Sequence, residues 1–446
     1  MANDPGYCQF SRSKVERGDS RHLFSLSMAS LLLAGVTMGR AAPLVLTVSD
    51  AEGIAGRCAA PVSAAVDLAG YSNAAPASGQ FLLTALDEAG PDRAAPVAAQ
   101  FESDAPNSRR GTLLWLMPPG PAGRRKFTLE VEATPLTPLM RVRRDEVSGQ
   151  FELSEAGKPV LRYNYQTNEP GGLLAKVTPD NLKYARARSD YIHPLYGPGG
   201  EELTKDWSVD HPHHRGIYWA WPEVDYHGER GDLHALQRVF ARPTGKCEAK
   251  DGPVCALIDA ENLWLWDDRE PIVRERALIR AWCAGPAGRF IDLEFHFTAL
   301  KDDVALARRG TDKYGGLNIR LAAARDQEIV LHSDPAGTAL RGAWADLSGV
   351  FPGGKEAGLT VFQAPGNPDY PGDWIKYPEL NWLQPTFPAA GARYVLKKDQ
   401  PLVLKFRLFI HPGKADEAKL AEGWTAFARP IVVTTGEQSP STNPHL

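Results

Sequence analysis

The residues best suited to chemistry are concentrated in one short segment. Six of the eleven histidines lie between His193 and His234, and residues 210–216 at the centre of this stretch read DHPHHRG. Histidine exchanges protons near neutral pH and is a frequent metal ligand. Three imidazoles beside a carboxylate and a guanidinium are therefore expected to form a catalytic or metal-binding site.

We expect this segment to supply most of the catalytic groups. One histidine would act as general acid or base, Asp210 would orient an imidazole, and cationic side chains would stabilise negative charge. Because proline lacks the amide hydrogen of a central strand, the segment is expected at an edge or in a turn. The predicted catalytic residues are His193, Asp210, His211, His213, His214, Arg215 and Lys313.

The same histidines leave metal binding open. In an extended segment His211 and His213 point to one side and His214 to the other, and His193, His227 or His234 could complete a three-ligand set. The ion would be zinc, copper or calcium, although the sequence has no H-E-x-x-H motif. The predicted metal ligands are His211, His213 and His193. Histidines that merely hydrogen-bond a loop together are a further alternative.

A tryptophan-bearing strand follows the histidine segment. Trp219 and Trp221 share one face of the predicted strand over residues 217–221. An indole beside histidine and arginine is typical of a sugar site, because the flat ring stacks on a pyranose while polar groups hold its hydroxyls. The predicted substrate-binding residues are Trp219, Trp221, His227, Arg230, His234, Asn318 and Arg320.

Short alternating strands separated by turn residues predict an all-β fold. Residues 43–138 are predicted to form a small immunoglobulin-like β-sandwich. Residues 140–430 contain longer strands, such as residues 290–297 with apolar side chains at every second position, and are predicted to form a large antiparallel β-sandwich. The polar residues 431–446 are predicted to be a disordered tail.

The amino-terminal segment, residues 1–41, has the features of an export signal. Basic residues precede the apolar run 23–38, which ends at a small-x-small pattern before Ala41. The run is too short to span a membrane. We therefore expect a cleaved signal peptide, a periplasmic or secreted protein, and no membrane span in the mature chain.

Charge and cysteine positions narrow the chemistry further. A formal net charge of -4 gives no indication of nucleic-acid binding. Cys247 and Cys255 lie symmetrically about the turn pair Asp251-Gly252, which predicts a disulfide across a hairpin, with free thiols as the alternative.

Several segments together resemble one known family. They are residues 191–221, 227–232, 310–320, 342–349, 364–374 and 401–413, and DHPHHRG is the most specific motif among them. Their order is similar to that of the secreted bacterial family labelled "methane oxygenase PmoA-like". The resemblance implies an uncharacterised function, often beside sugar-catabolic genes. The label refers to a multi-helix membrane subunit, which this β pattern does not match, so methane oxidation is not carried over.

A second resemblance concerns the fold. The H-x-R-G turn at residues 213–216, entering a tryptophan strand, is similar to aldose epimerases of the galactose-mutarotase kind. It implies a large super-sandwich with a histidine acid and a carboxylate base. We predict an exported carbohydrate-active enzyme of epimerase, lyase or hydrolase type, acting on a small-molecule or oligosaccharide substrate. The alternatives are a histidine-ligated metal-dependent oxygenase or hydrolase, and a non-catalytic glycan-binding protein.

Overall fold

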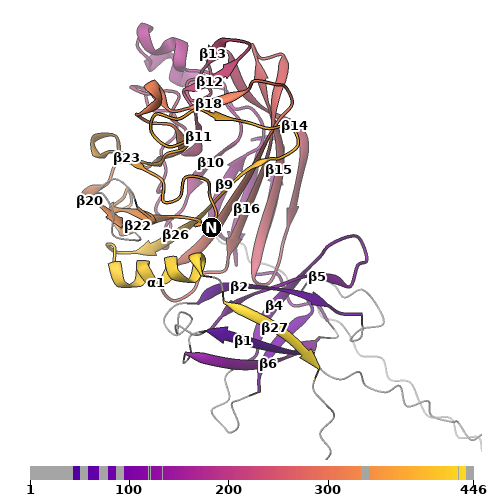
Figure 1. Cartoon of the computed structure of the whole chain (residues 1–446). Helices are drawn as coiled ribbons and strands as arrows, with labels where there is room; N and C mark the ends of the chain where they lie inside the picture. Colours follow the sequence, from indigo (N-terminus) through magenta and orange to yellow (C-terminus); the bar gives the residue numbers. More distant parts are fainter. Residues whose placement is uncertain are drawn as a thin grey trace, which may run out of the picture. The chain divides into compact units, whose positions relative to one another are not determined.

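The structure is a computed structural model (Figure 1). The described residues are 44–50, 59–69, 79–86, 95–118, 120, 122–132, 134–332, 342–429 and 431–437. The predicted signal peptide and residues 438–446 of the predicted tail lie outside them. Among the described residues there is no helix of the length and apolarity needed to cross a membrane.

Two eight-stranded antiparallel sheets enclose the main core. The first sheet, in spatial order, contains β23 (Trp374–Tyr377), β24 (Trp382–Pro385), β19 (Gly316–Arg320), β11 (Ile217–Ala220), β10 (Tyr191–Leu195), β9 (Lys158–Asn164), β8 (Gln150–Glu155) and β7 (Met140–Asp145). The second contains β14 (Val239–Lys250), β15 (Cys255–Trp266), β16 (Glu270–Trp282), β17 (Arg289–Ala299), β26 (Leu402–Pro412), β22 (Glu356–Gln363), β21 (Trp344–Val350) and β20 (Arg325–His332). Their facing side chains form one apolar cluster, so the predicted all-β class and large sandwich are confirmed.

Period-two alternation builds this core. In β17, Ile291, Leu293, Phe295 and Phe297 are buried, and the polar residues that alternate with them are half-buried. Phe297 lies edge-on to Trp219 of the first sheet, with ring centroids 5.0 Å apart. Alternate side chains of both sheets thus meet in the middle of the sandwich, as the sequence pattern predicts.

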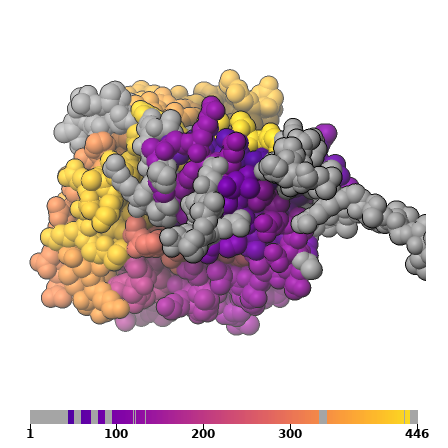
Figure 2. All heavy atoms as spheres, turned by 90° about the horizontal axis from the view of Figure 1, so that it is seen from below, coloured from indigo at the N-terminus to yellow at the C-terminus, as the bar shows by residue number. Residues whose placement is uncertain are grey.

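The amino-terminal strands form a separate seven-stranded antiparallel sheet around its own apolar cluster. Its strands, in spatial order, are β2 (Ala60–Asp67), β5 (Arg110–Met117), β4 (Val97–Ser103), β3 (Phe81–Ala85), β6 (Gly123–Val131), β1 (Leu44–Asp50) and β27 (Val432–Glu437). The last of these corrects the predicted tail, because Val432–Glu437 pair with β1 instead of lacking structure. Figure 2 shows yellow carboxy-terminal residues beside indigo amino-terminal ones. A tail rich in threonine and valine suits a strand once β1 offers it a free edge.

Smaller elements complete the described chain. A four-stranded sheet contains β13 (Glu229–Gly231), β12 (Glu223–Tyr226), β18 (Ala305–Ala307) and β25 (Tyr394–Val395). The short 3-10 helices are η2 (Gly171–Lys176), η3 (Pro179–Tyr184), η4 (Arg309–Thr311) and η5 (Pro378–Leu380). Asp416 caps helix α1 (Glu417–Ala428), because its side chain accepts a hydrogen bond from the backbone amide of Lys419. The helix packs Leu420 and Trp424 on an apolar cluster of the second sheet.

The predicted disulfide does not form, because Cys247 and Cys255 are both free thiols. Cys247 is paired with Ala260 across the hairpin, and Cys255 lies at the start of β15 opposite Trp282. The turn is wider than the two-residue turn that the symmetry implied. Lys250 pairs with Leu257, so residues 251–256 connect the last paired positions of the hairpin, and Gly252 among them pairs with Met140.

Candidate functional site

The histidine segment lies in the connection between β10 and β11 and forms a turn. The backbone amide of His214 donates a hydrogen bond to the carbonyl of His211 at 2.9 Å. The rings of His213 and His214 consequently lie side by side, with centroids 4.6 Å apart. An extended segment would have sent these two imidazoles to opposite faces, so the turn is what brings them together.

Arg215 anchors this turn to the first sheet. Its guanidinium forms an ion pair with Asp206, donates to the hydroxyl of Tyr191 and stacks 3.4 Å from the ring centroid of Trp207. The side chain of Arg215 is 1% exposed. Gly216 follows with φ +66°, and a Cβ there would lie 2.2 Å from the carbonyl oxygen of Ile192, so only glycine allows this approach. Arg215 is therefore a structural anchor and does not face the cavity.

A third imidazole arrives from a distant turn. His234 follows β13, and its backbone amide donates to the carbonyl of Trp221 at 3.3 Å. Its ring centroid lies 4.6 Å from that of His213 and 5.2 Å from that of His214. Its Nδ1 lies 3.1 Å from the hydroxyl of Tyr218. The turn before β11 of the first sheet and the turn after β13 of the four-stranded sheet thus place three histidine rings next to one another.

His213, His214 and His234 have the geometry of a metal-ligand set. One ring nitrogen from each can be chosen so that all three lie within 4.8 Å of one another. Among the described residues, the buried Nδ1 atoms of His213 and His214 have no hydrogen-bond partner. Buried nitrogens without partners are costly, and an ion held between them would satisfy them.

Electrostatics keeps these imidazoles neutral. Burial, reinforced by the charges of His211 and Arg188, lowers the pKa of His213 to about 3. Burial also places the pKa values of His214 and His234 well below the usual range. Neutral imidazole is the form that binds a metal ion, because its lone pair is free.

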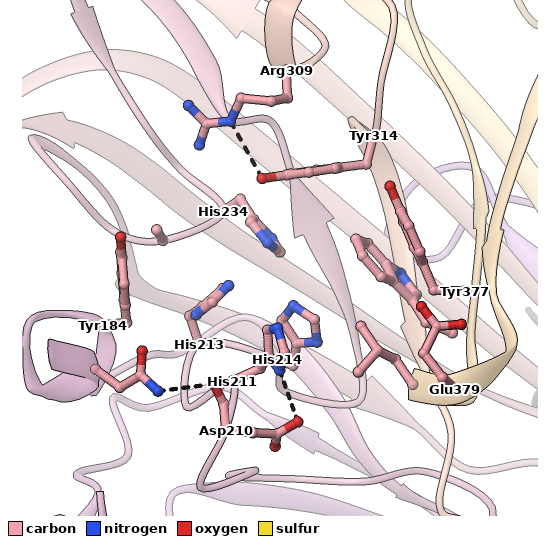
Figure 3. A pocket seen from close by; sticks show the side chains of 14 residues that line it. Tyr184, Asp210, His211, His213, His214, His234, Arg309, Tyr314, Tyr377 and Glu379 are labelled. Carbon is pink, nitrogen blue, oxygen red and sulfur yellow. Dashed lines mark hydrogen bonds and ion pairs between the residues drawn. The ribbon is translucent and has the colours of Figure 1, made fainter. Parts of the chain in front are cut away.

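The three histidines open into a cavity of about 540 Å³ (Figure 3). Aromatic side chains stand on two sides of it: Tyr184 from η3 on one side, and Tyr314 and Tyr377 on the other. Trp382 lines the cavity from β24, and its ring centroid is 5.0 Å from that of His214. The remaining lining residues are Asn181, Asp210, His211, Ala235, Arg309, Glu379 and Leu380.

Asp210 and His211 form a hydrogen-bonded pair at the cavity wall. The Nδ1 of His211 lies 2.8 Å from a carboxylate oxygen of Asp210, and the His211 side chain is 37% exposed. A guanidinium nitrogen of Arg320 lies 4.0 Å from the same carboxylate. Burial raises the pKa of Asp210, but the hydrogen bond from His211 and the charge of Arg320 outweigh burial and lower it. The structure thus places the carboxylate of Asp210 beside one ring nitrogen of His211.

Five of the predicted site residues line the cavity, and two more lie in β19 without lining it. His213, His214, His234, Asp210 and His211 line the cavity. Asn318 and Arg320, predicted to bind substrate, are buried in β19 behind the histidines. Their alternation along β19 puts them on the face opposite the core residues of that strand.

Other predicted residues lie away from the cavity. Trp219 and Trp221 are a clear correction, because they are 3% and 0% exposed in the main core and not in a sugar platform. The two tryptophans share a face, as predicted, but it is the face that packs on the second sheet. Tyr218, which precedes Trp219 and has its side chain on the opposite face, points to the site instead, with its hydroxyl 3.1 Å from Nδ1 of His234.

The remaining predicted polar residues are also outside the cavity lining. His193 is half-buried, with Nδ1 3.0 Å from the hydroxyl of Thr204, so it does not join the histidine triplet. His227 and Lys313 are exposed, and Arg230 forms ion pairs on the surface of the four-stranded sheet. The triplet thus replaces the predicted ligand set, in which His193 and His211 accompanied His213.

Sequence reasoning missed the aromatic walls. No spacing in the sequence connects Tyr314, Tyr377 and Trp382 with the histidines. Tyr184 gave no sequence signal, because it ends a 3-10 helix with no amphipathic pattern. These residues meet only through pairing of β24 with β19 and of β19 with β11.

A family model matches residues 150–425, which include the whole cavity lining, and its description is "Family of unknown function (DUF6807)". No curated protein matches the chain.

Among solved structures, one similar chain is described as a protein in the glycosyl hydrolase family 38 from Enterococcus faecalis. It is 9% identical, with a TM-score of 0.40. The alignment covers 90% of this chain and 48% of that chain, so the protein spans about half the length of that structure.

Proposed function

We propose that this chain, which belongs to the DUF6807 family of unknown function, is a metal-dependent enzyme that acts on a carbohydrate. One observation carries the proposal: three neutral imidazoles, two of them buried and one half-buried, offer nitrogens within 4.8 Å of one another at the wall of a cavity. Three protein ligands with an open side are typical of catalytic rather than structural metal sites. His213, His214 and His234 are the proposed ligands.

The ligand set favours Lewis-acid chemistry. No carboxylate belongs to the triplet, so a divalent ion there would keep its full charge. Arg309 and Arg320 add positive charge nearby, and both contribute to the low pKa of His213. A strongly polarising ion of this kind activates water or a substrate oxygen. A neutral nitrogen set suits zinc or copper better than calcium, because calcium prefers oxygen ligands.

His211 is placed to move a proton in this reaction. Asp210 holds its Nδ1 at 2.8 Å, and its ring centroid is 4.8 Å from that of His214. An imidazole oriented by a carboxylate can accept a proton from a bound water or sugar hydroxyl through its other nitrogen. Asp210 and His211 then serve as the acid–base pair, and the triplet serves as the ion-binding site.

The cavity walls suit a sugar ring. Tyr184 and Tyr377 face the cavity from opposite sides (Figure 3), and aromatic faces stack on the apolar face of a pyranose. Asn181, Arg309 and Glu379 supply hydrogen-bonding groups for its hydroxyls. The volume of about 540 Å³ is in the usual range for small-ligand sites.

The test combines substrate screening with metal exchange. The protein, stripped by a chelator and reloaded with zinc, is incubated with a panel of glycosides and oxidised sugars, and products are followed by mass spectrometry. Turnover that needs the ion, and that is lost in His214→Ala but kept in the control His227→Ala, supports the proposal. Equal turnover by the stripped and reloaded proteins contradicts it.

A second candidate is metal-free acid–base catalysis on a sugar. The pair Asp210–His211 favours it, since that pair forms without any ion. In this case the stripped enzyme is fully active and Asp210→Asn is impaired. Tight glycan binding without any product would instead favour a non-catalytic glycan-binding protein.

We also propose that the protein is exported and that it is related to the secreted PmoA-labelled family. The basis for export is the apolar run 23–38 followed by a small-x-small pattern, and the basis for the relationship is the DHPHHRG motif. Amino-terminal sequencing of protein from the bacterial periplasm checks it. A mature chain starting near Ala42 supports export, and retention of residues 1–41 in the cytoplasm contradicts it.

A further inference from the structure

His234 differs from the other two proposed ligands in how its ring is held. Its Nδ1 is hydrogen-bonded to the hydroxyl of Tyr218 at 3.1 Å, whereas the Nδ1 atoms of His213 and His214 have no partner among the described residues. The rings of Tyr218 and His234 are parallel to within 4°. The hydrogen bond occupies Nδ1, so only Nε2 of His234 remains for an ion.

A buried arginine holds the same histidine from its backbone. Arg188 is 3% exposed and donates hydrogen bonds to the carbonyl oxygens of Leu233 at 2.6 Å and His234 at 2.7 Å. Its guanidinium carbon also lies 4.3 Å from the ring centroid of Tyr218. One side chain therefore fixes both the turn that carries His234 and the tyrosine that fixes the ring.

We infer that Tyr218 and Arg188 are positioning residues, which hold His234 so that its Nε2 is presented to the ion. The inference rests on the proposed metal centre and deepens it. Histidine ligands commonly donate their second ring nitrogen to an oxygen, which sets the tautomer and the ring direction. Tyr218 supplies that oxygen here, and Arg188 sets the position of Tyr218.

The choice of partner also affects the ion. A phenol is neutral at neutral pH, whereas the carboxylate often found in this role adds negative charge. The hydroxyl of Tyr218 therefore orients His234 without reducing the positive charge of the centre. This agrees with a ligand set that contains no carboxylate.

The experiment measures cobalt binding by the full-length protein, because Co²⁺ replaces zinc and absorbs in the visible range. We expect Tyr218→Phe to weaken Co²⁺ binding by about 10- to 100-fold and to shift the absorption bands. The phenylalanine keeps the ring beneath Arg188, so the fold is retained. The matched control is Tyr226→Phe, because Tyr226 is 1% exposed and its hydroxyl makes a hydrogen bond of the same length, 3.1 Å, to Glu270.

A second measurement needs no variant at this position. In ¹⁵N-labelled, zinc-loaded wild type, we expect the His234 ring to carry its proton on Nδ1 and to bind zinc through Nε2, and His234→Gln assigns the signal. A wild type that binds no Co²⁺ overturns the metal centre and this inference with it. A wild type that binds Co²⁺ while Tyr218→Phe binds it equally well, with unchanged absorption bands, overturns the inference alone.

Discussion

Side chains on the two faces of β11, and of Trp221 directly after it, have different surroundings. On one face, Trp219 and Trp221 are stacked 4.6 Å apart and meet Phe297 edge-on. On the other face, Tyr218 meets His234, and beyond it lie His213 and His214 with unpartnered buried nitrogens. The first face is closed apolar packing, and the second is polar and open to a cavity.

Successive side chains of a strand point to opposite faces, so a residue that packs in the core can be the direct neighbour of a residue that faces the site. An apolar face is stabilised by burial and ring contacts alone. A polar face that leaves buried nitrogens without partners is destabilising by itself, so a protein retains it where a bound group compensates. The site therefore lies on a face with buried imidazole nitrogens that have no partner among the described residues, and the stacked tryptophans lie on the opposite face.

The largest expected effect comes from removing a histidine of the polar face. His214→Ala takes away one proposed ligand, and we expect the rate of the metal-dependent reaction to fall about 10³-fold or more, because a bound ion contributes several kcal/mol to catalysis. The melting temperature of the metal-free protein should fall by several degrees as well, because the buried ring that contacts Trp382 is also removed. Steady-state kinetics and calorimetry measure the two quantities. A variant with normal rate and a collapsed melting temperature would make His214 a packing residue.

The complementary change on the apolar face should act on stability. Trp221→Ala leaves a large void between the sheets, and we expect a loss of about 3–5 kcal/mol in the free energy of unfolding. The hydrogen bond from its indole to the carbonyl of Phe387 at 2.7 Å is lost as well. Urea denaturation measures the loss. A cost below about 1 kcal/mol would show that this face is not closely packed.

A smaller effect that depends on pH is expected inside the core. Glu275 is fully buried and accepts a hydrogen bond from the indole of Trp264 at 2.6 Å. Burial, together with the neighbouring carboxylate of Asp190, raises the pKa of Glu275 well above its usual value. The folded state thus binds this proton more tightly than the unfolded state. The stabilisation is complete below the unfolded pKa and is lost as pH rises through the folded pKa.

Glu275→Gln tests this sign, because glutamine keeps an acceptor for Trp264 and never ionises. Wild-type stability should fall as pH rises above the usual carboxyl range, and the variant should show a flatter profile. Denaturation curves at several pH values give both profiles. Identical slopes for the two proteins would mean that Glu275 does not hold the proton.

The smallest expected effect concerns substrate stacking. Tyr184→Ala removes one aromatic wall, and we expect KM to rise roughly 2- to 12-fold with little change in kcat, since such a ring contact contributes about 0.5–1.5 kcal/mol. Leu182→Ala is the control, because Leu182 is 44% exposed on the same 3-10 helix and does not line the cavity. A fall in kcat at constant KM would place Tyr184 in the chemical step instead.

Much of the architecture could be predicted from local patterns. Alternation along β17 identifies which side chains are buried, and the all-β class follows from such strands. The same pattern grouped Trp219 with Trp221, but alternation alone does not say which face is core. Their pairing with Phe297 on another sheet decides that, and it depends on long-range strand order.

The site could be predicted only where its residues are close together in the sequence. His213 and His214 are adjacent, so their clustering was visible, whereas His234 joins them through a separate turn held by Arg188. Tyr184 precedes the histidine segment in the sequence and comes from the 3-10 helix η3. Similarly, Cys247 and Cys255 are symmetric about Asp251-Gly252 in the sequence, but Cys247 pairs with Ala260 and Lys250 with Leu257, so the centre of the hairpin lies beyond that turn pair.

The central claim is tested most directly by the metal content of untagged protein. Elemental analysis of wild type, after incubation with zinc and removal of free ions, should find one ion per chain, and His213→Ala, His214→Ala and His234→Ala should each lose it. His227→Ala and His193→Ala should keep it. A wild type without a bound ion, or triplet variants that retain theirs, would contradict the proposed centre.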